Sequence, residues 1–213
     1  MFSGSEFMSK VLRELAVKSH HKTIFKRRIQ ALTKAIVPHL KPGQILDVGC
    51  GNGMLASVVG QQRPDIEIQG VDIYLRPKSY IPVKQFEGDT LPFDDNTFTS
   101  VMIVDVLHHT DNPAIILAEC LRVSSEIVVV KDHLYRNSWE HMLLRGMDWV
   151  GNAPHGVRLP YNYFTPQTWL DCLKEAGLHE TSRINFVSGL YPQPLQWIAG
   201  GRIQFISTLT EQL

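Results

Sequence analysis

An apolar run that ends in closely spaced glycines constrains the fold of this chain more than any other feature. Residues 45–48 suit a strand that is covered on both faces, and three glycines follow at alternate positions: Gly49, Gly51 and Gly53. Glycines at this spacing let the backbone approach a bound molecule, because they carry no Cβ atom. Residues 54–62 then continue as a predicted helix. The stretch therefore predicts a buried strand, a ligand-binding turn and a helix.

Two kinds of nucleotide site begin with such a turn, and the spacing distinguishes them. Dinucleotide-binding turns follow the pattern G-x-G-x-x-G/A, whereas this chain has Met54 where the third small residue belongs. Asp47 lies two residues before the first glycine, and its carboxylate would repel a phosphate but attract a cationic group. A ligand that carries an ammonium and a sulfonium group but no phosphate fits this turn better than a dinucleotide does. The alternative is that the glycines serve tight packing alone.

The residues from Asp47 to Gly53 resemble motif I, D-x-G-x-G-x-G, of the class I S-adenosylmethionine-dependent methyltransferases. The resemblance is closest to the small-molecule branch related to the ubiquinone and menaquinone methyltransferases. It implies a Rossmann-like α/β fold with a seven-stranded sheet, mostly parallel with one antiparallel strand, and helices on both faces. It also implies S-adenosyl-L-methionine as cofactor, bound by Asp47, Gly49, Cys50, Gly51, Asn52 and Gly53.

A second predicted strand, residues 66–73, contains an acid near its end. In a doubly wound sheet, a carboxylate at the tip of the neighbouring strand lies across the glycine turn and can accept both ribose hydroxyls. We therefore expect Asp72 to bind the ribose and Ile73 to pack on the adenine. The segment before the third strand, near residues 84–87, is short and contains two prolines, so the second helix of the family should be short or missing.

The resemblance continues to the end of the fourth predicted strand, residues 99–106. In related enzymes, the loop with an acid at the Asp89 position lies along the adenine edge. Asp89 and Thr90 are therefore expected to bind the cofactor. Open α/β sheets hold their ligands at the carboxyl ends of the strands, so Asp105 is also expected in the cofactor site.

The Leu-His-His element after this strand resembles that of the quinone-type methyltransferases. His108 or His109 could accept a proton from an acceptor hydroxyl or acidic carbon, because imidazole titrates near neutral pH. Asp132 and His133 follow the fifth predicted strand, residues 126–131, and are expected beside them. The alternative is that the two histidines only line the pocket or cap the next helix. Common nucleic-acid amino-methyltransferases have an Asn/Asp-Pro-Pro-aromatic run here, so no nucleic acid partner is expected.

Two segments flank this predicted core. Residues 133–164 are rich in aromatic side chains, which favours an inserted lid over a small, apolar acceptor; a satellite core without a ligand is the alternative. Residues 1–41 hold nine Lys/Arg against two Asp/Glu. We expect residues 8–41 to form a helical lid whose basic side chains are solvated or contact an anionic membrane surface, and residues 1–7 to be an expression remnant.

The rest of the chain fits a single domain over residues 42–213. A last helix is predicted to begin at Thr165-Pro166 and to stop at Gly177, with strands near residues 181–188 and 202–209. The three cysteines lack metal-ligand spacing, so we expect reduced thiols in a cytoplasmic protein and no metal site.

These features together predict a methyltransferase that moves a methyl group from S-adenosylmethionine to a small, apolar acceptor. One alternative is a non-catalytic module that binds S-adenosylmethionine or S-adenosylhomocysteine and acts through a protein partner. An NAD-dependent oxidoreductase is disfavoured by Met54 and Asp47. Whether a general base takes part is left open.

Overall fold

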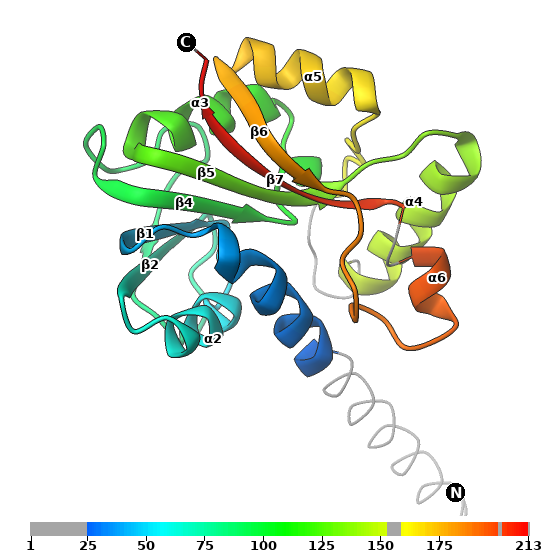
Figure 1. The fold of residues 1–213 in the computed structure, drawn as a ribbon, viewed down its shortest axis with the longest axis horizontal. Coiled ribbons are helices and arrows are strands. Elements are labelled where there is room, and N and C mark those ends of the chain that lie inside the picture. Colours follow the sequence, from blue (N-terminus) through cyan, green and yellow to red (C-terminus); the bar gives the residue numbers. More distant parts are fainter. Residues whose placement is uncertain (1–24, 153–158, 200–201, 213) are drawn as a thin grey trace, which may run out of the picture.

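The computed structural model describes residues 25–152, 159–199 and 202–212. A seven-stranded sheet has the order β3-β2-β1-β4-β5-β7-β6, with helices on both faces (Figure 1). The strands are β1 (Gly43–Val48), β2 (Ile66–Asp72), β3 (Val83–Gln85), β4 (Phe98–Val104), β5 (Ser124–His133), β6 (Leu178–Ile184) and β7 (Gln204–Glu211). Strand β7 runs antiparallel to β5 and β6, and the other pairs are parallel. The predicted sheet is confirmed.

The sheet separates the apolar core into two layers, and helices cover each of them. On one face α3 and α5 pack against the sheet, and on the other face α2 and a helix over residues 25–36 cover it (Figure 1). The remaining helices are short or lie beyond the end of β5. All the named helices have these bounds: η1 (Val37–His39), α2 (Met54–Gln62), η2 (Leu107–His109), α3 (Pro113–Val123), α4 (Ser138–Asn152), α5 (Pro166–Glu175) and α6 (Leu195–Ala199).

The central strands are buried because both layers cover them. The last four residues of β1, including Asp47, are buried, and so are seven consecutive residues of β5. Parallel strands in this order bring the carboxyl ends of β1, β4 and β5 to one edge of the sheet. Side chains that follow these three strands are thereby placed close together, although they are far apart in the sequence.

Several predicted elements are confirmed and others have different bounds. Helix α2 has the predicted limits, and Thr165 caps α5 by accepting from the Thr168 backbone N–H. No helix lies within the described segment 73–82, as the two prolines there predicted. Strand β6 begins three residues before its predicted start, and β5 extends to His133 because β7 pairs with it as far as Gln204.

The N-terminal segment is described only in part. Its first predicted portion, including the expected expression remnant at residues 1–7, lies outside the described residues. The helix over residues 25–36 buries Ile29, Leu32 and Ile36, while Lys26 and Arg27 are exposed. Its apolar side therefore belongs to the core of the domain.

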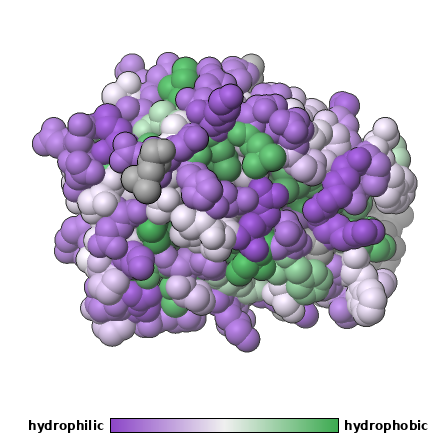
Figure 2. All heavy atoms as spheres, turned by 45° about the horizontal axis from the view of Figure 1, so that its top comes forward, coloured by the Kyte–Doolittle hydropathy of each residue, from purple (hydrophilic) through white to green (hydrophobic). Residues whose placement is uncertain are grey.

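The molecular surface is predominantly hydrophilic on the face drawn in Figure 2, with small hydrophobic areas between polar residues. Among the described helices, none has the length and apolar character required to cross a membrane. Large apolar side chains are nevertheless exposed on α4: Trp139, Met142, Trp149 and Val150.

Trp169 offers a test of the α5 face of the core. Its ring is fully buried between Phe164 and Phe205, with ring centroids 5.1 and 4.8 Å away. Trp169→Ala should lower the free energy of unfolding by about 3–5 kcal/mol, because a large cavity remains. Leu170→Ala, at the exposed neighbouring position, should change it by about 0.5 kcal/mol or less. Urea titration of both variants measures the difference, and equal effects would contradict this packing.

Candidate active site

The three glycines after β1 have different roles. All have positive φ angles, 71° at Gly49, 59° at Gly51 and 72° at Gly53. A Cβ atom on Gly49 would lie 2.4 Å from Val106, and one on Gly53 would lie 2.3 Å from Ile81. These two glycines are thus required by packing. A Cβ atom on Gly51 would meet no atom of the described residues within 4 Å, so on this side the backbone of Gly51 is open to a ligand.

Asp72 closes the turn from the tip of β2. Its Oδ2 atom accepts a hydrogen bond from the Gly51 backbone N–H at 2.7 Å, and Oδ1 accepts from the Tyr74 N–H at 2.9 Å. The carboxylate therefore lies across the glycine turn. Nearby, Asn52 accepts from the Met54 N–H at 3.2 Å, and Ile73 is half-exposed.

The predicted adenine-edge residues and the motif thiol differ in their exposure. Asp89 and Thr90 are exposed in the loop after β3. Burial raises the pKa of the Cys50 thiol well above its usual range, and the nearby Asp47 and Asp72 carboxylates add to the effect. Cys50 is therefore a neutral thiol and not a nucleophile. Cys50, Cys120 and Cys172 are all free.

Asp47 is a buried carboxyl group without a cationic partner among the ion pairs of the described residues. Burial, and then the charge of Asp72, raise its pKa to about 8. At neutral pH the group is therefore mostly protonated. A cationic ligand group at the glycine turn would favour its ionised form, in agreement with the charge argument from the sequence.

A second, partly buried charge network lies at the ends of β4 and β5. Asp105 has a positive φ of 56°, which is uncommon for a residue other than glycine. Its Oδ1 atom accepts from the Lys131 ammonium, which is fully buried, and its Oδ2 atom accepts from the Arg28 guanidinium. Arg28 also donates to the Tyr191 hydroxyl at 2.9 Å. The helix over residues 25–36 is thereby bound to the edge of the sheet where the site lies.

The charges in this network are mutually stabilised. Burial alone would raise the pKa of Asp105, but Lys131 and Arg28 outweigh it and hold this pKa well below its usual range. Burial lowers the pKa of Lys131, although Asp105 partly opposes the effect. Both carboxylate oxygens of Asp105 are engaged by protein cations, so this residue has a structural role in addition to its predicted place in the cofactor site.

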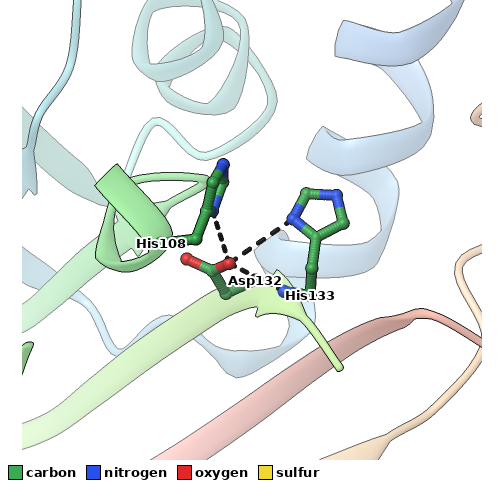
Figure 3. Close-up of side chains that lie close together, drawn as sticks. All are labelled: His108, Asp132 and His133. Atoms are coloured by element: carbon green, nitrogen blue, oxygen red, sulfur yellow. Dashed lines mark hydrogen bonds and ion pairs between the residues drawn. The ribbon is translucent and has the colours of Figure 1, made fainter. Parts of the chain in front are cut away.

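His108 and Asp132 form a buried pair beside this network (Figure 3). His108 and Asp132 are 2% and 0% exposed, and His108 Nδ1 lies 2.6 Å from Asp132 Oδ1. Burial would raise the pKa of Asp132, but His108 and its hydrogen bond lower it well below the usual value. Burial would lower the pKa of His108, and Asp132 outweighs that effect and raises it. An ionised Asp132 accepts the Nδ1 proton, which leaves Nε2 of a neutral His108 as a hydrogen-bond acceptor.

His133 has a different environment although its backbone N–H donates to Asp132 Oδ1 at 2.7 Å. Its Nδ1 atom is buried and has no hydrogen-bond partner among the described residues; it lies 3.4 Å from Asp132 Oδ1 and 3.6 Å from Asp105 Oδ1. Burial and the nearby Lys131 charge lower its pKa to about 4. His133 is therefore a neutral imidazole near neutral pH.

His108 and His109 lie on the same side, although alternation along a continued strand would direct them to opposite sides. Strand β4 ends at Val104, and the positive φ of Asp105 turns the backbone into the 3₁₀ helix η2. Both imidazoles therefore lie together, with ring centroids 4.1 Å apart. Each also has its Nε2 atom near Asp148 Oδ1, at 4.0 Å from His108 and 3.8 Å from His109.

The aromatic segment supplies residues that the sequence did not identify. Asp148 lies on α4, and the Tyr163 hydroxyl donates to its Oδ2 atom at 2.9 Å. The Tyr163 ring stacks on His108 with centroids 5.3 Å apart. Lys131 was detectable, because a lysine within an otherwise apolar strand needs a buried counter-ion. No sequence pattern indicated that Asp148 and Tyr163 would meet the two histidines.

Asp47 should make the stability of the fold depend on pH. Its pKa is about 8 in the folded chain and about 3.9 in an unfolded chain, so the folded state keeps a proton that the unfolded state releases. The contribution of this proton to stability is present below about pH 4 and is lost as pH rises through about 8. Asp47→Asn has no such proton, so it should gain stability relative to the wild type between about pH 5 and 8.

Urea titrations near both pH values measure this gain. Asp65→Asn is the control, because the Arg63 hydrogen bond lowers the pKa of Asp65, and its effect should be independent of pH in this range. A stability difference between Asp47→Asn and the wild type that stays constant with pH would contradict the assignment.

Comparison with known proteins places these features in a family. Residues 20–182 match the family described as methyltransferase domain. The ubiquinone/menaquinone biosynthesis C-methyltransferase of Desulfotalea psychrophila is 32% identical over 91 residues, which cover 38% of this chain and 37% of that protein. The ubiquinone biosynthesis O-methyltransferase of Cereibacter sphaeroides is 25% identical over 169 residues, which cover 72% of this chain and 66% of that protein. The chain thus spans about two thirds or less of these relatives.

A solved structure gives the same result for the fold. A geranyl diphosphate methyltransferase in complex with S-adenosylmethionine aligns with a TM-score of 0.60 and 14% identity, over 86% of this chain and 85% of that one. At this identity the likeness concerns the arrangement of helices and strands.

Proposed function

Because this chain belongs to the methyltransferase-domain family, we propose that it transfers the methyl group of S-adenosyl-L-methionine to a small, apolar acceptor held beside His108. One observation carries the proposal. The glycine turn, where Gly51 donates to Asp72, lies at the same edge of the sheet as the His108–Asp132 pair, because both follow neighbouring strands. A cofactor at the first place and an acceptor at the second would be adjacent.

The cofactor half of the proposal uses the residues around the glycine turn. Gly51 admits the ligand to the backbone, and Asp72 lies where ribose hydroxyls can donate to it. The other proposed cofactor contacts are Asp47, Gly49, Cys50, Asn52, Gly53, Ile73, Asp89, Thr90 and Asp105. When bound, the cofactor supplies a sulfonium-activated methyl group. The carboxyl group of Asp47 offers a partner for the cationic groups of this ligand.

The acceptor half depends mainly on positioning. The acceptor atom must lie about 3–3.5 Å from the methyl carbon and in line with the carbon–sulfur bond. The carbon–sulfur electron pair would return to sulfur, and a hydroxyl or acidic-carbon acceptor would release its proton to His108 Nε2. His108 Nε2 can hold a hydroxyl or acidic carbon in this place, because Asp132 fixes the opposite ring nitrogen. His109 and His133 border the same site.

The side chains around His108 support an apolar acceptor. Tyr163 stacks on His108, and Tyr161 and Met147 pack in the same cluster. The relatives described above are named for C- and O-methylation in ubiquinone biosynthesis, which favours an aromatic ring with a hydroxyl group or an acidic ring carbon. A cytoplasmic location, a lid formed by residues 8–41 and a membrane-surface contact through its basic side chains stay predictions.

Gly51→Ala tests the cofactor half. The added Cβ atom would occupy the space left for the ligand, so S-adenosylhomocysteine binding should weaken about tenfold or more, or about 1.4 kcal/mol. Gly177→Ala is a matched control, since Gly177 has a φ of 71°, has open space around its Cβ position and follows α5. Calorimetric titration of both variants measures the affinity. Equal affinity for Gly51→Ala and the wild type would place the cofactor elsewhere.

His108→Asn and Asp132→Asn test the acceptor half. Loss of the oriented imidazole that accepts the proton should lower turnover by about 100-fold or more, because an amide side chain cannot take up that proton. Affinity for S-adenosylhomocysteine should be unchanged in both variants. The measurement is the rate of S-adenosylhomocysteine formation with phenolic and quinol acceptors. Turnover within tenfold of the wild type in both variants would exclude this role, and tight cofactor binding by the wild type without any turnover would favour the non-catalytic alternative.

A further inference from the structure

We propose that His108, His109 and Asp148 form a binding site for one divalent transition-metal ion of the zinc class. The three ligand atoms lie within 4.8 Å of one another. His108 Nε2 is 4.0 Å and His109 Nε2 is 3.8 Å from Asp148 Oδ1. Zinc binds imidazole nitrogen and carboxylate oxygen at about 2.0–2.2 Å, so atoms at these separations can share an ion. A tetrahedral ion would draw each of these two imidazole nitrogens about half an ångström closer to Asp148 Oδ1.

Two neighbouring side chains orient the ligands. Asp132 accepts from His108 Nδ1 at 2.6 Å, which directs the lone pair of Nε2 toward Asp148. Metal-ligating histidines commonly donate their second ring N–H to a carboxylate in this way. Tyr163 donates to Asp148 Oδ2 at 2.9 Å, and the other oxygen of this carboxylate is the one that lies near both imidazoles. The same tyrosine stacks on the His108 ring and fixes its plane.

The chemistry and burial of the ligands indicate the class of ion. Two imidazole nitrogens and one carboxylate suit zinc, iron(II) or cobalt(II), whereas magnesium and calcium prefer oxygen ligands alone. The side chains of His108 and Asp148 are 3% and 7% exposed, and that of His109 is 19% exposed. The cluster is therefore closed on the side of His108 and reachable beside His109. A tetrahedral ion takes four ligands, so beyond these three described side chains it would take one more, such as water or an acceptor oxygen.

A second group of His108, Asp132 and His133 also has metal-ligand spacing, but its hydrogen bonds argue against it. Asp132 Oδ2 accepts from the Leu107 backbone N–H at 3.0 Å, and Oδ1 accepts from both His108 and the His133 N–H. An ion there would displace the Nδ1 proton of His108. Asp132 is better placed as the residue that orients a metal ligand.

The site deepens the proposed function and rests on it in one step. An ion at this place would hold an acceptor oxygen and lower the pKa of its hydroxyl group, so that the proton would pass to solvent water beside His109 before methyl transfer. His108 would then position the acceptor through the ion. Metal binding itself requires no cofactor and no acceptor, so it can be measured separately.

The test is a cobalt(II) titration of the full chain after removal of metal with a chelator. The wild type should bind one equivalent and develop a visible d–d absorption band typical of a four-coordinate site, and zinc should displace the cobalt. His109→Ala and Asp148→Asn should each weaken binding at least tenfold. Asp132→Asn should weaken it about 10- to 100-fold, as expected for a residue that orients a ligand.

Two control variants report on adventitious binding. His179→Ala changes an exposed histidine on β6, and a double change of His20 and His21 to alanine removes adjacent histidines outside the described residues. Both should bind cobalt as the wild type does. The proposal is overturned if the wild type binds no stoichiometric ion, or if folded His109→Ala and Asp148→Asn bind as tightly as it does. Cobalt bound as expected by a protein that fails to bind S-adenosylhomocysteine would support this site and reject the proposed function.

Discussion

The ionised carboxylate of Asp132 is the interaction on which the acceptor side of the site depends. A buried charge is costly unless hydrogen bonds compensate for it. Asp132 accepts from the Leu107 backbone, from the His133 backbone and from the His108 imidazole. It thereby fixes the 3₁₀ turn after β4 against the end of β5. The position of the turn and the orientation of His108 follow from this one group.

Asp105 extends the same principle to the N-terminal helix. Its carboxylate accepts from Lys131 on strand β5 and from Arg28 on the helix over residues 25–36. The two networks meet at His133, whose Nδ1 atom lies between the two carboxylates. Charged side chains thus join the helix over residues 25–36, the ends of β4 and β5, and the turn that holds His108. Apolar contacts alone do not hold these elements together.

The sequence predicted the parts of the site that come from the ends of parallel strands. Glycine spacing identified the turn after β1, and an acid near the end of the next strand identified Asp72, because parallel strands bring their carboxyl ends together. The direction of His108 and His109 depends on a single backbone angle at Asp105, and residue type gives no measure of that angle. Asp148 and Tyr163 reach the site through the packing of α4, which arises from long-range contacts. No local pattern encodes such contacts.

The separate roles of the three glycines have a consequence for how a ligand enters. Gly49 and Gly53 are locked by Val106 and Ile81, so the shape of the turn is set by the core before any ligand arrives. An incoming molecule then has little backbone to order, and the entropic penalty of association is small on this side of the site. The rate of association should therefore be governed by diffusion and by access to the turn, and not by the folding of a loop around the ligand.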